Sequence, residues 1–256
     1  MKRLLLLSAV LLCISAYGQE AEINTVEGFF DWTYEFYGIS VKLPEGYSAE
    51  KTKVLWSYRP ELRHPLGGLF SVAAISPDRN CVVFYPEIVF KIMKQGQDNI
   101  DGRMALIVRG LKYLTGVVGE DGKFTDPDNT SFNPADYITT IKGKAVRDAF
   151  NADYIFLYGV DFDPAVLSCP AKGFSIPFDK ENYSKLQRVH IVKEGGSNYD
   201  LLLLFTESGY EKRWKYFLDL SGTITFDTRK IRQTWVVTEG RYPTGTTERD
   251  ETRDSH

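Results

Sequence analysis

The stretch from Tyr199 to Asp227 most constrains the fold, because three different periodic patterns follow one another there. The apolar run Leu201–Phe205 is typical of a buried strand, and the turn residues Glu207–Gly209 end it. An amphipathic helix pattern then includes Trp214–Leu218, and Gly222–Phe226 alternates as a short strand does. We therefore predict a strand–helix–strand unit that closes a hydrophobic core.

The first third of the chain favours strands separated by turns. The predicted strands are Trp32–Leu43, in which Gly38 marks a bulge, Lys53–Tyr58, Leu69–Ile75 and Cys81–Tyr85. Because strands and turns alternate at short intervals, this region predicts an antiparallel meander.

The middle of the chain adds helices and a hairpin. Helices are predicted for Asp98–Tyr113 and for Pro134–Phe150, where Asn133 would serve as N-cap. Tyr154–Val160 reads as a buried central strand, and Glu194–Asn198 joins the strands Lys185–Val192 and Tyr199–Phe205 into a hairpin. We predict an α+β fold, mainly an antiparallel sheet packed with two to three helices, in a single domain of residues 19–238. Residues 239–256 are polar and charged, and we expect a flexible tail.

The first 18 residues resemble an export signal. Lys2 and Arg3 precede an apolar run that is too short to span a bilayer as a stable helix, and Ala16 and Gly18 suit a signal-peptidase site. The alternative is an N-terminal anchor. Leu12 precedes Cys13 where a lipoprotein signal needs a small residue, so we expect no lipid on Cys13. The sequence predicts a signal peptide, export to the periplasm or the extracellular space, and no transmembrane segment after signal removal.

The charge of the chain argues against nucleic acid as a partner. Loss of Lys2 and Arg3 leaves 29 of the 31 basic residues against 34 acidic ones, a net charge near −5. Such a chain creates no field that attracts phosphates.

Two cysteines follow the signal, Cys81 and Cys169. In an oxidising compartment they could form a disulfide that closes a loop of about 88 residues, worth about 4 kcal/mol in the chain-entropy model. Both also lie beside apolar residues, so two buried thiols are the alternative. The spacing excludes a CxxC redox motif.

Acidic residues give two candidate sites. Asp161 and Asp163 follow a buried strand and could serve acid–base chemistry or bind a cation, although a solvated turn stopped by Pro164 is the simpler interpretation. Asp126, Asp128 and Thr130 alternate as at the start of a calcium loop. Ser131 and Tyr137 stand where that loop needs glycine and glutamate, which favours a solvated loop and no metal site.

The histidines show no metal-ligand spacing. His64 lies in a loop and His190 within a strand pattern, and we expect structural roles for both. The sequence contains no Gly-x-Ser-x-Gly elbow, Walker loop or dinucleotide fingerprint, so we expect no cofactor.

Clustered aromatic residues are the remaining lead. Tyr34, Tyr37, Trp56 and Tyr58, with Phe36, lie close together in sequence. On paired strands they could form a platform for a sugar or a peptide, while their alternation also suits a core.

Two segments resemble the Mog1/PsbP-like family. One is the strand and turn Tyr37–Tyr47, an aromatic-Gly-apolar strand leading into Pro44-Glu45-Gly46. The other is the closing helix that runs into Ser221–Phe226. The resemblance implies an antiparallel sheet between helices that is used for binding or assembly. It implies no catalytic residue.

These observations predict an exported, non-catalytic binding or assembly protein whose ligand is a protein or a glycan. The predicted binding residues are Tyr34, Tyr37, Trp56, Tyr58, Asp161 and Asp163. The alternative is a secreted hydrolase in which Asp161 or Asp163 pairs with a carboxylate of the Asp121–Asp128 loop.

Overall fold

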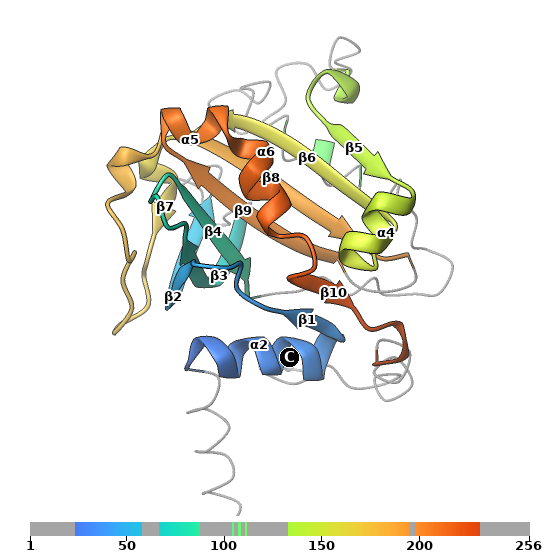
Figure 1. Cartoon of the computed structure of the whole chain (residues 1–256). Helices are drawn as coiled ribbons and strands as arrows, with labels where there is room; N and C mark the ends of the chain where they lie inside the picture. The colour runs from blue at the N-terminus through green and yellow to red at the C-terminus, as the bar shows by residue number, and fades with distance from the viewer. Residues whose placement is uncertain are drawn as a thin grey trace, which may run out of the picture.

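The computed structural model describes residues 24–57, 67–87, 104, 107–108, 111, 133–194 and 198–230. It shows an α+β fold in which one large antiparallel sheet of eight strands is accompanied by a two-stranded ribbon (Figure 1). The strand order in the large sheet is β5-β6-β8-β9-β4-β3-β2-β7, and the ribbon pairs β1 with β10. The predicted fold class is confirmed.

The described part of the chain contains ten strands. Their bounds are β1 Ile39–Val41, β2 Ser48–Ser57, β3 Gly67–Ile75, β4 Cys81–Pro86, β5 Thr139–Lys142, β6 Tyr154–Asp161, β7 Leu167–Ser168, β8 Lys185–Val192, β9 Asn198–Phe205 and β10 Ile224–Phe226. The predicted meander is confirmed, since β3 pairs antiparallel with both β2 and β4. So is the hairpin, since β8 pairs antiparallel with β9.

Four helices described along their whole length cover one face of the sheet. They are α2 Val26–Tyr37, α4 Lys144–Phe150, α5 Glu207–Glu211 and α6 Arg213–Asp219, with 3-10 turns at Pro134–Asp136, Pro164–Val166 and Lys180–Asn182. Figure 1 shows α4, α5 and α6 across the front of the strands, with α2 below the β1/β10 ribbon. One hydrophobic cluster joins these helices and the ribbon to the sheet through side chains such as Phe29, Phe150, Tyr199, Phe217 and Phe226.

Two smaller clusters lie on the other face. One includes Trp56, Phe84 and Leu204, against which Phe162 and Tyr183 pack from the segment after β6. The other gathers Phe156 and Tyr158 with Ile107 and Leu111. Met104, Ile107, Val108 and Leu111 are helical, as the spacing within Asp98–Tyr113 predicts; the other residues of that predicted helix lie outside the described residues.

The predicted strand Trp32–Leu43 is wrong over its first half. Residues Val26–Tyr37 form α2, in which the Thr25 side chain accepts a hydrogen bond from the Gly28 amide as N-cap. Gly38 has φ 66° and ends the helix in the left-handed conformation, so it is a helix cap and not a bulge. Only Ile39–Val41 is a strand. Phe29, Phe30 and Thr33 are the buried residues of α2, a helical spacing that the aromatic alternation obscured.

The predicted helix Pro134–Phe150 is also wrong in its first half. Asn133 does cap a turn, but this turn is a 3-10 turn that ends at Asp136. The chain then forms β5, which pairs with β6. Gly143 has φ 96°, a conformation that allows the strand to turn directly into α4.

Several predictions fall outside the described residues. They concern the signal peptide (residues 1–18), Tyr58, His64, the acidic loop with Asp121, Asp126, Asp128 and Thr130, and the tail (residues 239–256). No helix within the described part of the chain is long and apolar enough to cross a membrane.

Candidate functional site

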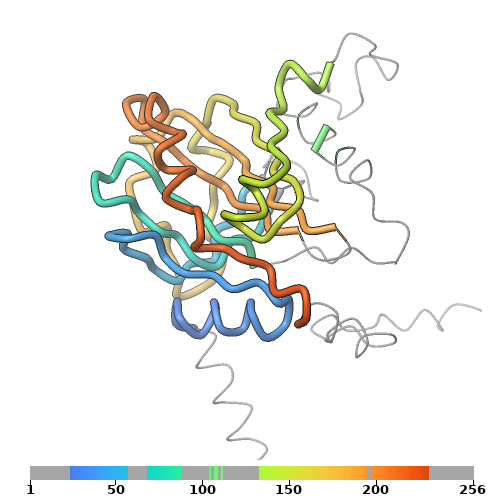
Figure 2. The backbone as a smooth tube through the Cα atoms, turned by 45° about the vertical axis from the view of Figure 1, so that its right-hand side comes forward, coloured from blue at the N-terminus to red at the C-terminus, as the bar shows by residue number. Residues whose placement is uncertain are grey.

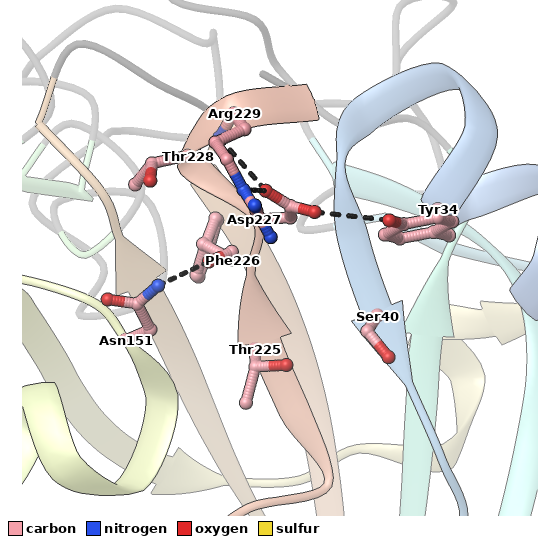
Figure 3. Close-up of a pocket in the computed structure, with 8 residues that line it drawn as sticks. All are labelled: Tyr34, Ser40, Asn151, Thr225, Phe226, Asp227, Thr228 and Arg229. Carbon is pink, nitrogen blue, oxygen red and sulfur yellow. Dashed lines mark hydrogen bonds and ion pairs between the residues drawn. The ribbon is translucent and has the colours of Figure 1, made fainter. Parts of the chain in front are cut away.

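An open groove of about 500 Å³ lies where the β1/β10 ribbon meets α2 and the end of α4 (Figure 3). Its eight lining residues are Tyr34, Ser40, Asn151, Thr225, Phe226, Asp227, Thr228 and Arg229. Figure 2 shows the blue and red ends of the tube running side by side at this place. The groove therefore unites residues that are far apart in the sequence.

The floor of the groove is formed by one cross-strand pair. Ser40 of β1 lies opposite Thr225 of β10. Because side chains alternate along a strand, their neighbours Ile39, Val41 and Phe226 turn into the core, while both hydroxyl groups remain on the half-buried outer side. Neither hydroxyl forms a hydrogen bond with another described residue.

Asp227 closes one end of the groove and fixes its shape. Its Oδ1 accepts hydrogen bonds from the backbone amides of Arg229 at 2.9 Å and Lys230 at 3.2 Å. Its Oδ2 accepts the Tyr34 hydroxyl at 3.1 Å. The Lys230 amide, followed by the Arg229 amide and the Tyr34 hydroxyl, holds the pKa of Asp227 below its usual range. Asp227 is therefore an ionised anchor that ties α2 to the end of β10.

The same hydrogen bond acts on its donor. The contact with Asp227 raises the pKa of the Tyr34 hydroxyl, so this group stays protonated and continues to donate. Lys230 reinforces the link, since its Nζ lies 2.6 Å from Glu35 Oε2. This contact also raises the pKa of Lys230. The wall formed by α2 is thus held in place by two connections to the chain after β10.

The opposite wall is formed by Asn151, the residue that caps α4 in the left-handed conformation. Its Nδ2 donates to the Phe226 carbonyl at 2.5 Å, which fixes the side chain (Figure 3). Arg229 is 92% exposed, and its Nε lies 3.9 Å from Asp227 Oδ1, beyond hydrogen-bond distance. The groove therefore offers hydroxyl groups, an amide oxygen and an exposed guanidinium side by side.

Of the described aromatic residues that were predicted to bind, Tyr34 alone lines this groove, and Tyr58 lies outside the described residues. Tyr37 belongs to the end of α2 and packs edge-on against Trp32, with ring centroids 5.4 Å apart. Trp56 is completely buried in β2 on the far face of the sheet, beneath the Arg188 guanidinium. Because Tyr34 and Tyr37 are helical and Trp56 is in the core, these residues do not form one platform on paired strands.

The two predicted carboxylates have structural partners. Asp161 lies at the exposed end of β6 and accepts a hydrogen bond from Lys185 Nζ at 2.6 Å. Asp163 caps the 3-10 turn Pro164–Val166, since its Oδ1 accepts the Ala165 amide at 2.9 Å. Their predicted partners in the Asp121–Asp128 loop lie outside the described residues.

Cys81 and Cys169 are both free, so the disulfide considered from the sequence is not formed. Cys81 is buried at the start of β4, and burial raises its pKa well above the ordinary thiol value. Cys169 is half-buried just after β7. Within the described part of the chain, no three His, Cys, Asp or Glu side chains gather into a group that could hold a metal ion.

Sequence reasoning missed seven of the groove residues, Ser40, Asn151, Thr225, Phe226, Asp227, Thr228 and Arg229. Ser40 and Thr225 stand in strand patterns as ordinary outward residues, and nothing local shows that the two strands pair. The one usable signal was Asp227, which follows a strand pattern and precedes residues that it can cap.

Comparisons of this chain with protein-family models, with curated proteins and with solved structures found no match. The resemblance to the Mog1/PsbP-like family stays a prediction.

Proposed function

We propose that this protein is an exported, non-catalytic binding protein that takes a short glycan in the groove between α2 and the β1/β10 ribbon. Export rests on the signal-like residues 1–18 of the sequence. The observation that carries the proposal is the pair of outward hydroxyl groups on Ser40 and Thr225, set in an open groove of about 500 Å³. Ligand sites of small molecules are commonly about 300–1,000 Å³ in volume.

The lining suits a hydroxyl-rich ligand better than a peptide. The donors and acceptors of Ser40, Thr225, Thr228 and Asn151 match the alternating donors and acceptors of sugar hydroxyl groups. A peptide would need a pocket for an apolar anchor, yet the apolar lining residue Phe226 is only 1% exposed. Tyr34 contributes an aromatic ring at the edge of the groove.

A hydrolase gains no support from the described residues. Among the described residues that line the groove, Asp227 is the only carboxylate, and its hydrogen bonds keep it ionised. Glycoside hydrolysis ordinarily uses two carboxyl groups, one of them a proton donor. Asp161 and Asp163 lie on other elements and are engaged by Lys185 and by the Ala165 amide.

The test is an NMR titration of the ¹⁵N-labelled protein with a panel of neutral and uronic-acid mono- and disaccharides. We expect at least one sugar to shift the amide signals of residues 39–41 and 224–229. The double variant Ser40→Ala/Thr225→Val should bind that sugar about tenfold more weakly, because two lost hydrogen bonds are worth about 1.4 kcal/mol together.

The matched control is Ser168→Ala/Thr140→Val, which makes the same changes at exposed positions of β7 and β5. It should bind like the unaltered protein. Absence of binding across the panel, or equal weakening in both double variants, would refute the proposal.

A further inference from the structure

Two charged side chains stand among the described residues that line the groove, Asp227 and Arg229. They are exposed to very different degrees, since the Asp227 side chain is 27% exposed and the Arg229 side chain 92%. A molecule that enters the groove therefore meets the guanidinium more readily than the carboxylate. The charge that the groove prefers in a ligand depends on how the protein engages each of the two groups.

Asp227 is engaged by the fold itself. Residues 228–230 are helical, and Asp227 stands directly before them, in the position of an N-cap. Its Oδ1 accepts the amides of Arg229 and Lys230, and its Oδ2 accepts the Tyr34 hydroxyl. Three donors thus surround the carboxylate and stabilise its negative charge. Asp227 is therefore a weak attractor for a cationic ligand.

Arg229 is held by its backbone and not by its guanidinium. The hydrogen bond from its amide to Asp227 fixes the point at which the side chain leaves the helical turn. The guanidinium approaches Asp227 Oδ1 only to 3.9 Å, and Figure 3 shows the side chain running alongside this carboxylate. Because the side chain is 92% exposed, its N–H donors face solvent. A ligand can therefore contact them without breaking a hydrogen bond to Asp227.

The same groove joins this guanidinium to the two hydroxyl groups of its floor. Ser40 and Thr225 lie opposite each other in the ribbon, and Arg229 follows Thr225 after the end of β10. All three residues line the one space of about 500 Å³. A ligand that contacts all of them needs hydroxyl groups over the floor and an anionic group toward Arg229.

A carboxylate suits this arrangement better than a doubly charged anion. The planar guanidinium can donate two parallel hydrogen bonds to the two oxygens of a carboxylate. A phosphate would bring a second negative charge close to the ionised Asp227, and like charges at short range repel. Sugars that carry hydroxyl groups and one carboxylate are the uronic acids.

We infer that the groove selects acidic sugars and that Arg229 is the residue that determines this specificity. The guanidinium pairs with the carboxylate of a uronic acid, while the hydroxyl groups of Ser40 and Thr225 bind those of the sugar ring. This inference rests on the proposed binding of a glycan in the groove, and it names the class of that glycan.

The test uses pairs of sugars that differ only in the carboxylate, namely glucuronate with glucose, galacturonate with galactose and mannuronate with mannose. Each is titrated into the ¹⁵N-labelled full protein at low salt. At least one acid should bind about tenfold more tightly than its neutral partner, through a charge-assisted pair of hydrogen bonds. The preference should shrink at high salt, because exposed charges are screened. Amino sugars should bind no more tightly than neutral sugars, and sugar phosphates more weakly than the acids.

Substitutions at Arg229 measure its part in the preference. Arg229→Gln removes the charge, and the ratio of acid to neutral affinity should fall close to unity. Arg229→Lys keeps the charge but loses the planar donors, so it should retain only part of the ratio. The matched control is Arg79→Gln, which removes the same charge from the exposed turn between β3 and β4, outside the groove lining. This variant should keep the ratio of the unaltered protein.

Failure of this inference can be told apart from failure of the proposed function. Neutral or amino sugars that bind as tightly as the acids, phosphates that bind more tightly, or an unchanged ratio in Arg229→Gln would overturn the acidic-sugar specificity and leave the glycan groove standing. Absence of binding by every sugar would overturn both. The comparison of acid with neutral sugar needs only the unaltered protein, so it remains a test even if a variant does not fold.

Discussion

Lys51 belongs to β2, and its side-chain amine points toward the core beneath α2. Its Nζ lies 4.3 Å from the centre of the Phe29 ring, and this nitrogen is buried without a hydrogen bond. Burial, reinforced by the nearby charge of Lys53, lowers the pKa of Lys51 from 10.5 to about 8. The unfolded chain therefore binds more protons than the folded protein between these two pH values. It follows that this residue opposes folding at neutral pH and that its effect fades as the pH rises.

Replacing Lys51 with methionine should raise the free energy of unfolding by about 2 kcal/mol at pH 7, because the desolvated charge is removed while the packing is kept. The gain should shrink from pH 8 upward and vanish near the pKa of a free lysine, 10.5. Urea unfolding at several pH values between 6 and 10.5 measures this. Lys53→Met is the control, because Lys53 pairs with Glu87 at 2.5 Å. Loss of this ion pair should not raise the free energy of unfolding. A loss of stability in Lys51→Met at pH 7 would contradict the argument.

At the scale of elements, α5 approaches the turn between β3 and β4 unusually closely. The Gly209 amide donates to the Thr206 hydroxyl that caps α5. A Cβ added at Gly209 would lie 2.2 Å from the Asn80 carbonyl oxygen, which belongs to the backbone and cannot rotate away. The same oxygen accepts the Thr206 amide at 3.1 Å. Only glycine allows this helix to begin where it does.

Gly209→Ala should therefore lower the free energy of unfolding by about 3 kcal/mol, the upper part of the range for overpacked sites. Chemical denaturation followed by circular dichroism provides the measurement. Gly28→Ala serves as the control, since Gly28 lies in the first turn of α2 and has no positive φ. That change should leave stability unchanged or raise it slightly. If both changes had equal effects, helix propensity, and not the close approach to Asn80, would determine the change in stability at Gly209.

The sequence predicts well those strands in which nearly every residue is buried. β8 and β9 are buried along nearly all of their length, and their apolar residues and the glycine turn between them leave few alternatives. α2 was missed because its aromatic residues have high strand propensity and alternate by chance over Trp32–Tyr37. Its N-cap, Thr25, and the glycine that ends it, Gly38, were both visible in the sequence, and spacing between buried residues would have decided in favour of a helix.

The sites were harder to predict because they depend on pairing between distant strands. Tyr34 was predicted to bind and does line the groove, but as part of a helix. Ser40 and Thr225 become neighbours only through the pairing of β1 with β10, which no local pattern encodes. Arg188 lies in a strand of mostly apolar residues. Its charged side chain in that buried strand is an unusual feature that the sequence alone shows and that was not used.

At the scale of the whole molecule, α2, the ribbon and the large sheet share one core. Phe29 of α2, Phe226 of β10 and Leu203 of β9 belong to a single hydrophobic cluster. If α2, the ribbon or the sheet separated from this cluster, apolar surface on the remaining elements would become exposed. We therefore expect the described part of the protein to unfold as one cooperative unit.

Phe226→Ala tests this cooperativity, because Phe226 is 1% exposed and lies in the outermost strand pair. It should lower the free energy of unfolding by about 3–5 kcal/mol. Urea curves from circular dichroism and tryptophan fluorescence should remain superimposable. Phe36→Ala is the control, since Phe36 is 37% exposed and should cost less. Separate transitions for the two probes would mean that the ribbon and α2 detach independently.

The ribbon has a further consequence when the chain is placed under tension. Ile39 pairs with Phe226, Ser40 with Thr225 and Val41 with Ile224, and the chain continues to α2 and to Asp227 from the same end of this ladder. A force that pulls α2 and residue 227 apart would therefore first load the Tyr34–Asp227 hydrogen bond and the hydrogen bond from the Asp227 amide to the Gly38 carbonyl. It would then load the pairs of the ladder in turn, beginning with Ile39–Phe226. Strands loaded in this way peel open one bond at a time, whereas strands pulled in shear resist with all their bonds together. We therefore expect the ribbon, although its inward side chains belong to the core, to open pair by pair under directed pulling.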